Sequence, residues 1–274
     1  MALGPTEMQQ RLDAHPFWYH TIDVAPGVTT KGWFDLRAVV DLMPWPEVRG
    51  KRCLDIGTFD GYLAFELERR GAAEVIAVDV EDHLLWDWPP DYRAKDLPRD
   101  PGFSGPPKGA GFRLAKDLMG SAVEWRPTSI YDLDPAQVGM FDVVVLGSLL
   151  LHLRDPLRAL EAVRRVTGGH LLSSDQIELG LTLASRKRPL LRLNGSGADC
   201  QWFNFNAAGH ERLLFAAGFE VQRRSRPYVV QFNQHPKDLP LTLGNLARRV
   251  GTRYLTGRAD VGVLHQGLLA RPRV

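Results

Sequence analysis

The sequence predicts an α/β fold: a Rossmann-like, doubly wound and mostly parallel seven-stranded sheet with helices on both faces, preceded by an N-terminal helical arm. Two observations predict it. From residue 52 onward, short apolar patterns typical of buried strands alternate with helical patterns, the order found in parallel sheets. Strand patterns at 52–56 and 74–78 also enclose a helical pattern at 62–70, which makes one complete βαβ unit.

The chain divides by pattern into two parts. Residues 1–50 carry closely spaced aromatic residues and are expected to form an arm that caps the substrate, whereas residues 51–274 are expected to form the Rossmann-like domain. In that domain, further strands are expected at 123–127, 141–146, 170–174, 220–224 and 262–270, and further helices at 111–119, 155–166 and 207–217. Residues 86–109 are rich in Pro and Gly and interrupt the alternation, as functional insertions often do.

Composition and charge narrow the class of protein. Of the 274 residues, 44% are hydrophobic and 24% charged, which is ordinary for a globular chain and excludes a disordered or fibrous one. The net charge is only +2, but the segment from Gly180 to the end holds 15 Lys and Arg against 5 Asp and Glu. This basic third could meet phosphate, nucleic acid or an acidic lipid surface, or it could be an ordinary solvated surface.

Several other classes of site are not expected. The two cysteines, Cys53 and Cys200, are too few for a metal framework, and Cys53 lies in a predicted buried strand, so we expect neither a disulfide nor a metal site. The sequence has no secretory signal pattern and no apolar run of about 18 residues, the length needed to span a bilayer. We therefore expect a cytoplasmic protein with no membrane partner, and the oligomeric state stays open.

The most informative motif follows the first strand of the domain and reads Asp55-Ile56-Gly57-Thr58-Phe59-Asp60-Gly61. Gly57 permits a backbone shape that a side chain would obstruct and leaves room for a ligand against the chain. Asp79 ends the second strand, where an acid can accept hydrogen bonds from ribose hydroxyls. The alternative is a structural turn with a surface acid nearby.

The acids of this turn favour one cofactor class over another. A nicotinamide site uses G-x-G-x-x-G and places a pyrophosphate at the helix N-terminus. Here the order is D-x-G-x-x-x-G, and its acids suit a cation better than a pyrophosphate. S-adenosylmethionine has a sulfonium, an ammonium and no phosphate, so we predict that it is bound by Asp55, Gly57, Thr58, Asp60, Gly61, Asp79, Val80, Ser129, Ile130 and Gly147.

Methyl transfer from a sulfonium needs mainly alignment of the reactants, with a base only where the acceptor must lose a proton. His152 after the fourth strand, His20 in the aromatic arm and Asp175 after the fifth strand are the candidate catalytic residues. The alternative for His152 is that it caps a turn. The aromatic residues expected to stack on the substrate, unless they only pack in the core, are Tyr19, Trp33 and Trp202.

These motifs resemble the class I S-adenosylmethionine-dependent methyltransferases. More narrowly, the chain resembles the family that contains tRNA 5-methoxyuridine methyltransferase and the carboxymethyl-transferring tRNA wobble-uridine enzyme. The narrower resemblance rests on residues 18–20 with 33–35, 54–61, 149–157, and 200–204 leading to 213–219. Carboxymethyl-transferring members carry an Arg-Tyr pair upstream of the segment that matches Trp202. Residues 193–199 lack this pair, so the resemblance implies ordinary S-adenosylmethionine as the donor.

Three functions remain open at this point. The first is O-methylation of a small molecule or a sugar hydroxyl. The second is methylation of 5-hydroxyuridine at the tRNA wobble position, which would make tRNA a partner and which the basic C-terminal third favours. The third is a non-catalytic subunit that binds S-adenosylmethionine.

Overall fold

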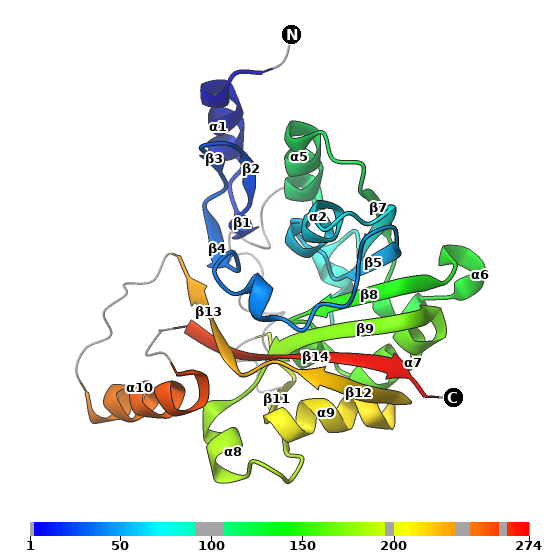
Figure 1. Ribbon diagram of the computed structural model, residues 1–274. Helices are drawn as coiled ribbons and strands as arrows, with labels where there is room; N and C mark the ends of the chain where they lie inside the picture. The colour runs from blue at the N-terminus through cyan, green and yellow to red at the C-terminus, as the bar shows by residue number, and fades with distance from the viewer. Residues whose placement is uncertain (1–2, 91–106, 195–199, 234–241, 258–261, 274) are drawn as a thin grey trace.

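The computed structural model describes residues 3–90, 107–194, 200–233, 242–257 and 262–273 (Figure 1). Its strands are β1 (Trp18–His20), β2 (Asp23–Ala25), β3 (Val28–Thr29), β4 (Gly32–Asp35), β5 (Arg52–Ile56), β6 (Glu74–Asp79), β7 (Glu124–Pro127), β8 (Phe141–Gly147), β9 (Thr167–Gln176), β10 (Leu191–Leu193), β11 (Phe203–Phe205), β12 (Phe219–Arg224), β13 (Tyr228–Phe232) and β14 (Gly262–Pro272).

The α-helices are α1 (Pro5–Ala14), α2 (Tyr62–Arg69), α5 (Ala110–Met119), α6 (Pro135–Val138), α7 (Pro156–Val166), α8 (Leu179–Ala184), α9 (Ala207–Ala216) and α10 (Leu243–Thr256). Short 3-10 helices are η1 (Val40–Leu42), η2 (His83–Leu85), η3 (Ile130–Asp132) and η4 (Leu150–His152). The predicted helices that begin near residues 62, 111, 155 and 207 are confirmed as α2, α5, α7 and α9.

One large sheet organises the described chain. Its ten strands run in the order β1-β4-β13-β14-β9-β8-β5-β6-β7, with β12 also paired to β14. The strands β5 to β9 are mutually parallel, whereas β14 is antiparallel to β9 and to β12. The predicted α/β fold is therefore confirmed, and the seven strands β7-β6-β5-β8-β9-β14-β12 correspond to the predicted sheet.

Helices cover both faces of this sheet (Figure 1). Side chains of β5 alternate between the two layers: Leu54 lies in a buried apolar cluster with Leu160 of α7, and Cys53 lies in a second cluster with Leu63 of α2 and Phe112 of α5. This alternation is the period-two pattern of a strand, and burial on both faces explains why β5 and β8 read as continuous apolar runs.

The N-terminal arm differs from the prediction. It begins with the helix α1, but β1 and β4 then join the large sheet, where β4 pairs with β13. These pairings extend the sheet to ten strands in place of the predicted seven. The expected division at residue 50 stays a prediction, and residues 91–106 of the predicted insertion lie outside the described residues.

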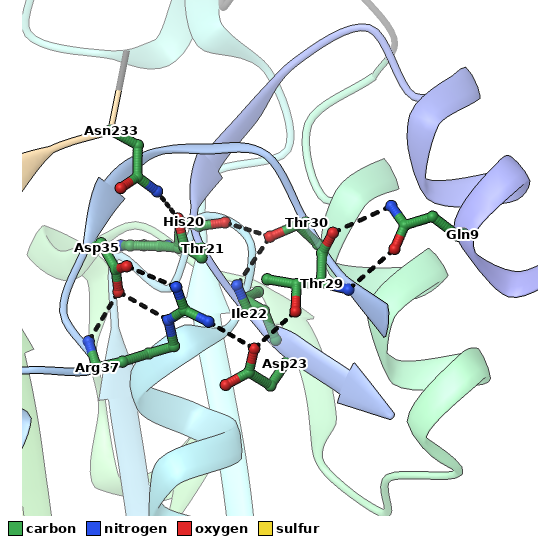
Figure 2. A network of polar contacts seen from close by, with 10 residues as sticks. All are labelled: Gln9, His20, Thr21, Ile22, Asp23, Thr29, Thr30, Asp35, Arg37 and Asn233. Carbon is green, nitrogen blue, oxygen red and sulfur yellow. Dashed lines mark hydrogen bonds and ion pairs between the residues drawn. The ribbon is translucent and has the colours of Figure 1, made fainter. Parts of the chain in front are cut away.

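A polar network holds the arm in place (Figure 2). The hydroxyl of Thr30 donates to the carbonyl of His20 at 2.7 Å and accepts from the backbone N–H of Ile22 at 2.8 Å. Asn233, just after β13, donates from its side-chain amide to the Thr21 hydroxyl. The position of His20 is therefore set by hydrogen bonds on both sides of it.

Candidate active site

A cavity of about 430 Å³ opens at the carboxyl ends of the central parallel strands. In an open α/β sheet, ligands bind at this edge. Its lining includes residues from the turn after β5, from the ends of β6, β8 and β9, and from the N-terminal arm. Among the predicted site residues, those that line it are Tyr19, His20, Trp33, Asp55, Gly57, Thr58, Asp79, Val80, Ser129, Ile130, Gly147 and His152.

The turn after β5 provides room for a ligand. Gly57 has a φ of +72°, and a Cβ atom there would lie 2.9 Å from the Leu149 side chain. Beside it, Oδ2 of Asp55 and Oγ1 of Thr58 are buried and make no hydrogen bond within the described structure. Buried acceptors normally have a partner. A bound ammonium group would supply one, so these residues fit the amino-acid end of S-adenosylmethionine.

The carboxyl group of Asp55 is also electrostatically unusual. Burial raises the pKa of Asp55 to about 7, because the charged form loses hydration there. An arriving cation favours ionisation of such a group. The turn therefore has the means to bind a positive charge and to release a proton when it does so.

Asp79, the predicted ribose acid, has partners already. Its Oδ2 accepts from the backbone N–H of Phe59 at 3.0 Å and from the Lys108 ammonium at 2.6 Å, and its Oδ1 accepts from the N–H of Val80 at 2.8 Å. Lys108 is buried and lies over the rings of Phe59 and Trp86. A ribose hydroxyl would therefore share Asp79 with Lys108 or displace it.

The next part of the cavity is formed after β7 and β8. Ile130 and the neighbouring Ser129 line it at the start of η3, where the Ser129 hydroxyl accepts from the N–H of Tyr131. Gly147 ends β8, and a Cβ atom there would lie 2.6 Å from the side chain of Leu63. The absence of a side chain at Gly147 thus keeps the floor of the cavity open.

Two predicted cofactor residues, Asp60 and Gly61, do not line the cavity. The buried carboxylate of Asp60 accepts from the backbone N–H groups of Tyr19 at 2.5 Å and His20 at 3.1 Å, so it joins the arm to the turn. Gly61 precedes α2 with a φ of +96°, and a Cβ atom there would lie 2.6 Å from Phe65 and Phe112. Both residues therefore shape the site and do not face a ligand.

The two histidines among the candidate bases differ in the direction of their pKa shifts. Burial lowers the pKa of His20 to about 3, and its buried Nδ1 makes no hydrogen bond in the described structure, so it is neutral. Burial opposes the charge on His152, but contact with Cys200 and the nearby Asp175 outweigh it and raise the pKa of His152 to about 9. Nδ1 of His152 lies 2.9 Å from the carbonyl of Cys200 and so carries a proton, which leaves Nε2 as the nitrogen that can accept one, and the role of His152 as a base stays a prediction.

Asp175 and Trp202 are not among the residues that line the cavity, and their expected roles as a base and as a substrate contact stay predictions. Asp175 is fully buried, and its carboxylate accepts from the backbone N–H groups of Leu149, Leu150 and Gln176. It is therefore a structural acid that holds the chain after β8. The indole N–H of Trp202 donates to the carbonyl of Asp87 at 2.5 Å, so Trp202 supports the cavity wall from outside.

Sequence reasoning missed a polar group at the other end of the cavity. Nε2 of His265 lies 2.8 Å from the hydroxyl of Ser148, and its Nδ1 lies 2.9 Å from the carbonyl of Val263. Burial lowers the pKa of His265 to about 4, so the ring is neutral. A carbonyl only accepts, so Nδ1 carries the proton and Nε2 accepts from Ser148. Beside this pair, the hydroxyl groups of Ser174 and Tyr228 lie 2.5 Å apart.

The backbone of Ser148 is also strained, with a φ of +49° directly after β8. Such strain in a residue other than glycine is often found at functional sites. A polar residue with positive φ at a strand end cannot be read from sequence. A histidine within the apolar last strand was the one visible signal for His265.

No group of His, Cys, Asp and Glu side chains among the described residues is arranged to hold a metal ion. None of the described helices has the length and apolar character needed to cross a bilayer.

Comparison with known proteins matches most of the chain to a family of domains. A family described as "Methyltransferase domain" matches residues 34–223. The ubiquinone biosynthesis O-methyltransferase of Hahella chejuensis is 30% identical over 117 residues, which is 43% of this chain and 39% of that relative. The aligned part is thus well under half the length of that relative.

The fold also has a solved counterpart. The crystal structure of the N-terminal domain of EvdMO1 with S-adenosylhomocysteine bound superposes with a TM-score of 0.54 at 17% identity, over 99% of this chain and 98% of that one. Identity at this level shows the fold alone. The family match over residues 34–223 shows that the chain belongs to the methyltransferase domain family.

Proposed function

We propose that the protein methylates a hydroxyl group of an uncharged small molecule, such as a phenol or a sugar. S-adenosylmethionine supplies an activated methyl group on a sulfonium. The residues of the chain have to orient the acceptor, exclude water and take up its proton. The single observation that carries the proposal is the chemistry of the cavity end away from the glycine turn.

That end of the cavity is polar but has few charges. Ser148, Ser174, Tyr228 and His265 provide hydroxyl and imidazole groups to the lining, which also includes the arm aromatics Tyr19, Trp33 and Phe34 and, from β13, Phe232. Among the described lining residues, Lys108 is the one Lys or Arg, and Asp79 already pairs with it. These features favour an uncharged, hydroxyl-bearing acceptor over a phosphate-bearing one, since a phosphate usually binds Arg or Lys.

The Ser148–His265 pair is the group that we assign to the acceptor proton. Because the Ser148 hydroxyl donates to Nε2 of His265, its oxygen is free to accept from an acceptor hydroxyl. As the acceptor oxygen bonds to the methyl carbon, its proton would pass to Ser148 while the Ser148 proton passes to His265. His20, neutral and with a free Nδ1, remains the second candidate for this step.

The matched relative supports oxygen as the methylated atom, because it is described as an O-methyltransferase. A second candidate, the tRNA wobble-uridine reaction implied by the sequence resemblance, is favoured by the basic C-terminal third. A uridine ring is itself uncharged and would suit the same cavity. The third candidate, a non-catalytic S-adenosylmethionine-binding protein, predicts cofactor binding without turnover.

A labelling experiment separates these candidates. The protein is incubated with S-adenosylmethionine labelled in the methyl group and with parallel sets of phenols, sugars, amines and unmodified tRNA. We expect label in a methyl ether of a phenol or sugar, identified by mass spectrometry, and a loss of turnover in His265→Gln. Label confined to tRNA or to amines would contradict the proposal, as would cofactor binding without transfer to any acceptor.

A further inference from the structure

The helix α10 has an unusual orientation, because most of its large apolar side chains face solvent, although Leu255 packs against the core. Leu243, Leu246, Val250 and Tyr254 are spaced three or four residues apart and so share one helix face, here named the α10 stripe. Leu243 is 88% exposed, Val250 62% and Tyr254 68%. The residues that α10 buries are Gly251 and Thr252. An ordinary surface helix buries its apolar stripe, so this one lacks a cover in the described structure.

The surroundings of the stripe are basic. The helix packs against α8 at the edge of the molecule (Figure 1), where a Cβ atom on Gly251 would lie 3.0 Å from the half-exposed Leu183. Arg186, in the chain after α8, donates to the Tyr254 hydroxyl at 3.0 Å. Segments 179–194 and 242–257 contain no Asp or Glu, and their basic residues are Arg186, Lys187, Arg188, Arg192, Arg248, Arg249 and Arg253. Of these, Arg192 pairs with Glu178, which directly precedes the first segment.

We propose that the α10 stripe rests in the headgroup region of an anionic lipid bilayer. An amphipathic helix with Leu, Val and Tyr on one face and Arg beside it suits this position, with apolar groups at the acyl boundary and cations at the lipid phosphates. Tyr254, apolar in its ring and polar at its hydroxyl, suits the same boundary. Lipid association of this kind needs no membrane span.

Two other occupants fit less well. A second copy of the chain would bring the same basic segments against one another, and like charges repel. A nucleic acid would match the charge but would leave the apolar stripe in water. The lipid surface satisfies the charge and the stripe together, and this inference is independent of the acceptor that the enzyme uses.

Vesicle co-sedimentation of the full chain tests the proposal. Wild type is compared with a stripe variant, Leu246→Glu with Val250→Glu, and with a matched control, Met140→Glu with Leu157→Glu. The control makes the same charge change at exposed apolar positions outside the two basic segments. All four positions are exposed, so both variants should fold, which circular dichroism and thermal melting verify.

Wild type and the control should bind vesicles of equal parts phosphatidylcholine and phosphatidylglycerol, and added salt should weaken binding because the attraction is partly electrostatic. Phosphatidylcholine alone should bind weakly. The stripe variant should lose affinity by on the order of tenfold or more, since acids at the acyl boundary and beside lipid phosphates are both unfavourable.

Equal sedimentation of the stripe variant and the control would overturn the proposal. A wild-type dimer in light scattering that the stripe variant abolishes, without vesicle binding, would identify a second copy as the occupant and also overturn it. Salt-sensitive binding of tRNA by wild type and stripe variant alike, with no binding to vesicles, would point to nucleic acid.

Discussion

The role of Asp79 in cofactor binding gives the sharpest test of the site. Changing Asp79→Ala alone would leave the Lys108 ammonium, 2% exposed, without its partner. Breaking a buried pair from one side costs about 3–5 kcal/mol in folding free energy, which would confuse a binding measurement. The appropriate perturbation is therefore the double variant Asp79→Ala with Lys108→Met, which removes both charges and keeps an apolar chain near Phe59 and Trp86.

The expected loss follows from the hydrogen bonds that Asp79 would make to ribose hydroxyls. Hydrogen bonds to a charged group contribute about 1.5–3 kcal/mol, which corresponds to a Kd weaker by about 10-fold to 150-fold. Lys108→Met alone is the control. In this variant Asp79 keeps the backbone N–H groups of Phe59 and Val80 as partners, and a cation next to the cationic cofactor is removed, so the affinity of a folded Lys108→Met protein should equal or exceed that of wild type.

Isothermal titration calorimetry with S-adenosylmethionine and S-adenosylhomocysteine measures both affinities, and urea unfolding confirms that each variant is folded. The assignment of Asp79 as the ribose acid would be refuted by a folded double variant with wild-type affinity. Weaker binding in Lys108→Met would show instead that Lys108 contributes to the cofactor site directly.

Three further predictions concern pH, backbone shape and the proton acceptor. Burial raises the pKa of Asp55 to about 7, so the affinity for S-adenosylmethionine should fall as the pH drops below 7. The affinity should fall by up to about tenfold per pH unit, because one carboxyl group must ionise. Asp55→Asn should remove this pH dependence of the affinity measured by calorimetry. Gly61→Ala should lower the free energy of unfolding in urea by about 2–5 kcal/mol, because the residue has positive φ and its Cβ atom would be overpacked. The control Gly120→Ala should lower it by about 1–2 kcal/mol, because Gly120 has positive φ but no atom within 4 Å of its Cβ position. Equal losses would contradict the close packing at Gly61. His265→Gln should lower kcat by on the order of 10²–10⁴ without changing cofactor affinity. His210 is also a buried histidine bonded to a serine, but it lies outside the cavity, so His210→Gln should keep wild-type kcat. Similar kcat values for both variants would exclude His265 as proton acceptor.

The parts of the fold that the sequence predicted are those with local signals. Asp155 caps α7 by accepting from the N–H of Arg158, and Pro156 occupies the first turn, so the start of that helix is encoded within a few residues. The apolar run of β8 reflects burial on both faces. The cofactor turn belongs to the same class, because its glycine and acids follow directly on a strand.

The parts that were missed depend on long-range partners. β13 pairs with β4, although the two strands are far apart in the sequence, and neither strand has a pattern that specifies the other. The aromatic arm therefore read as helical, although β1 and β4 extend the sheet. Lys108, near the end of the predicted insertion at 86–109, pairs with Asp79 at the end of β6. The sequence position and charge of Lys108 did not indicate that pairing.

The predicted site also contained two kinds of acid that sequence cannot separate. Asp55 has a buried oxygen with no described partner and lines the cavity, whereas Asp60 and Asp175 are equally buried but spend their oxygens on backbone N–H groups. Asp55 and Asp175 lie near the ends of the strands β5 and β9, and Asp60 lies in the turn after β5. Only the hydrogen-bond partners distinguish an acid available to a ligand from one that holds the chain.

This distinction explains how one turn can serve both substrates of a methyl transfer. Gly57 and Asp55 face the cavity where the cofactor is expected, while Asp60, three residues later, holds the backbone of Tyr19 and His20. Those two residues line the same cavity from the arm. Because the turn lies between β5 and α2, the wall that we propose for the acceptor is positioned by the turn that we propose for the donor, and this connection would align the two reactants.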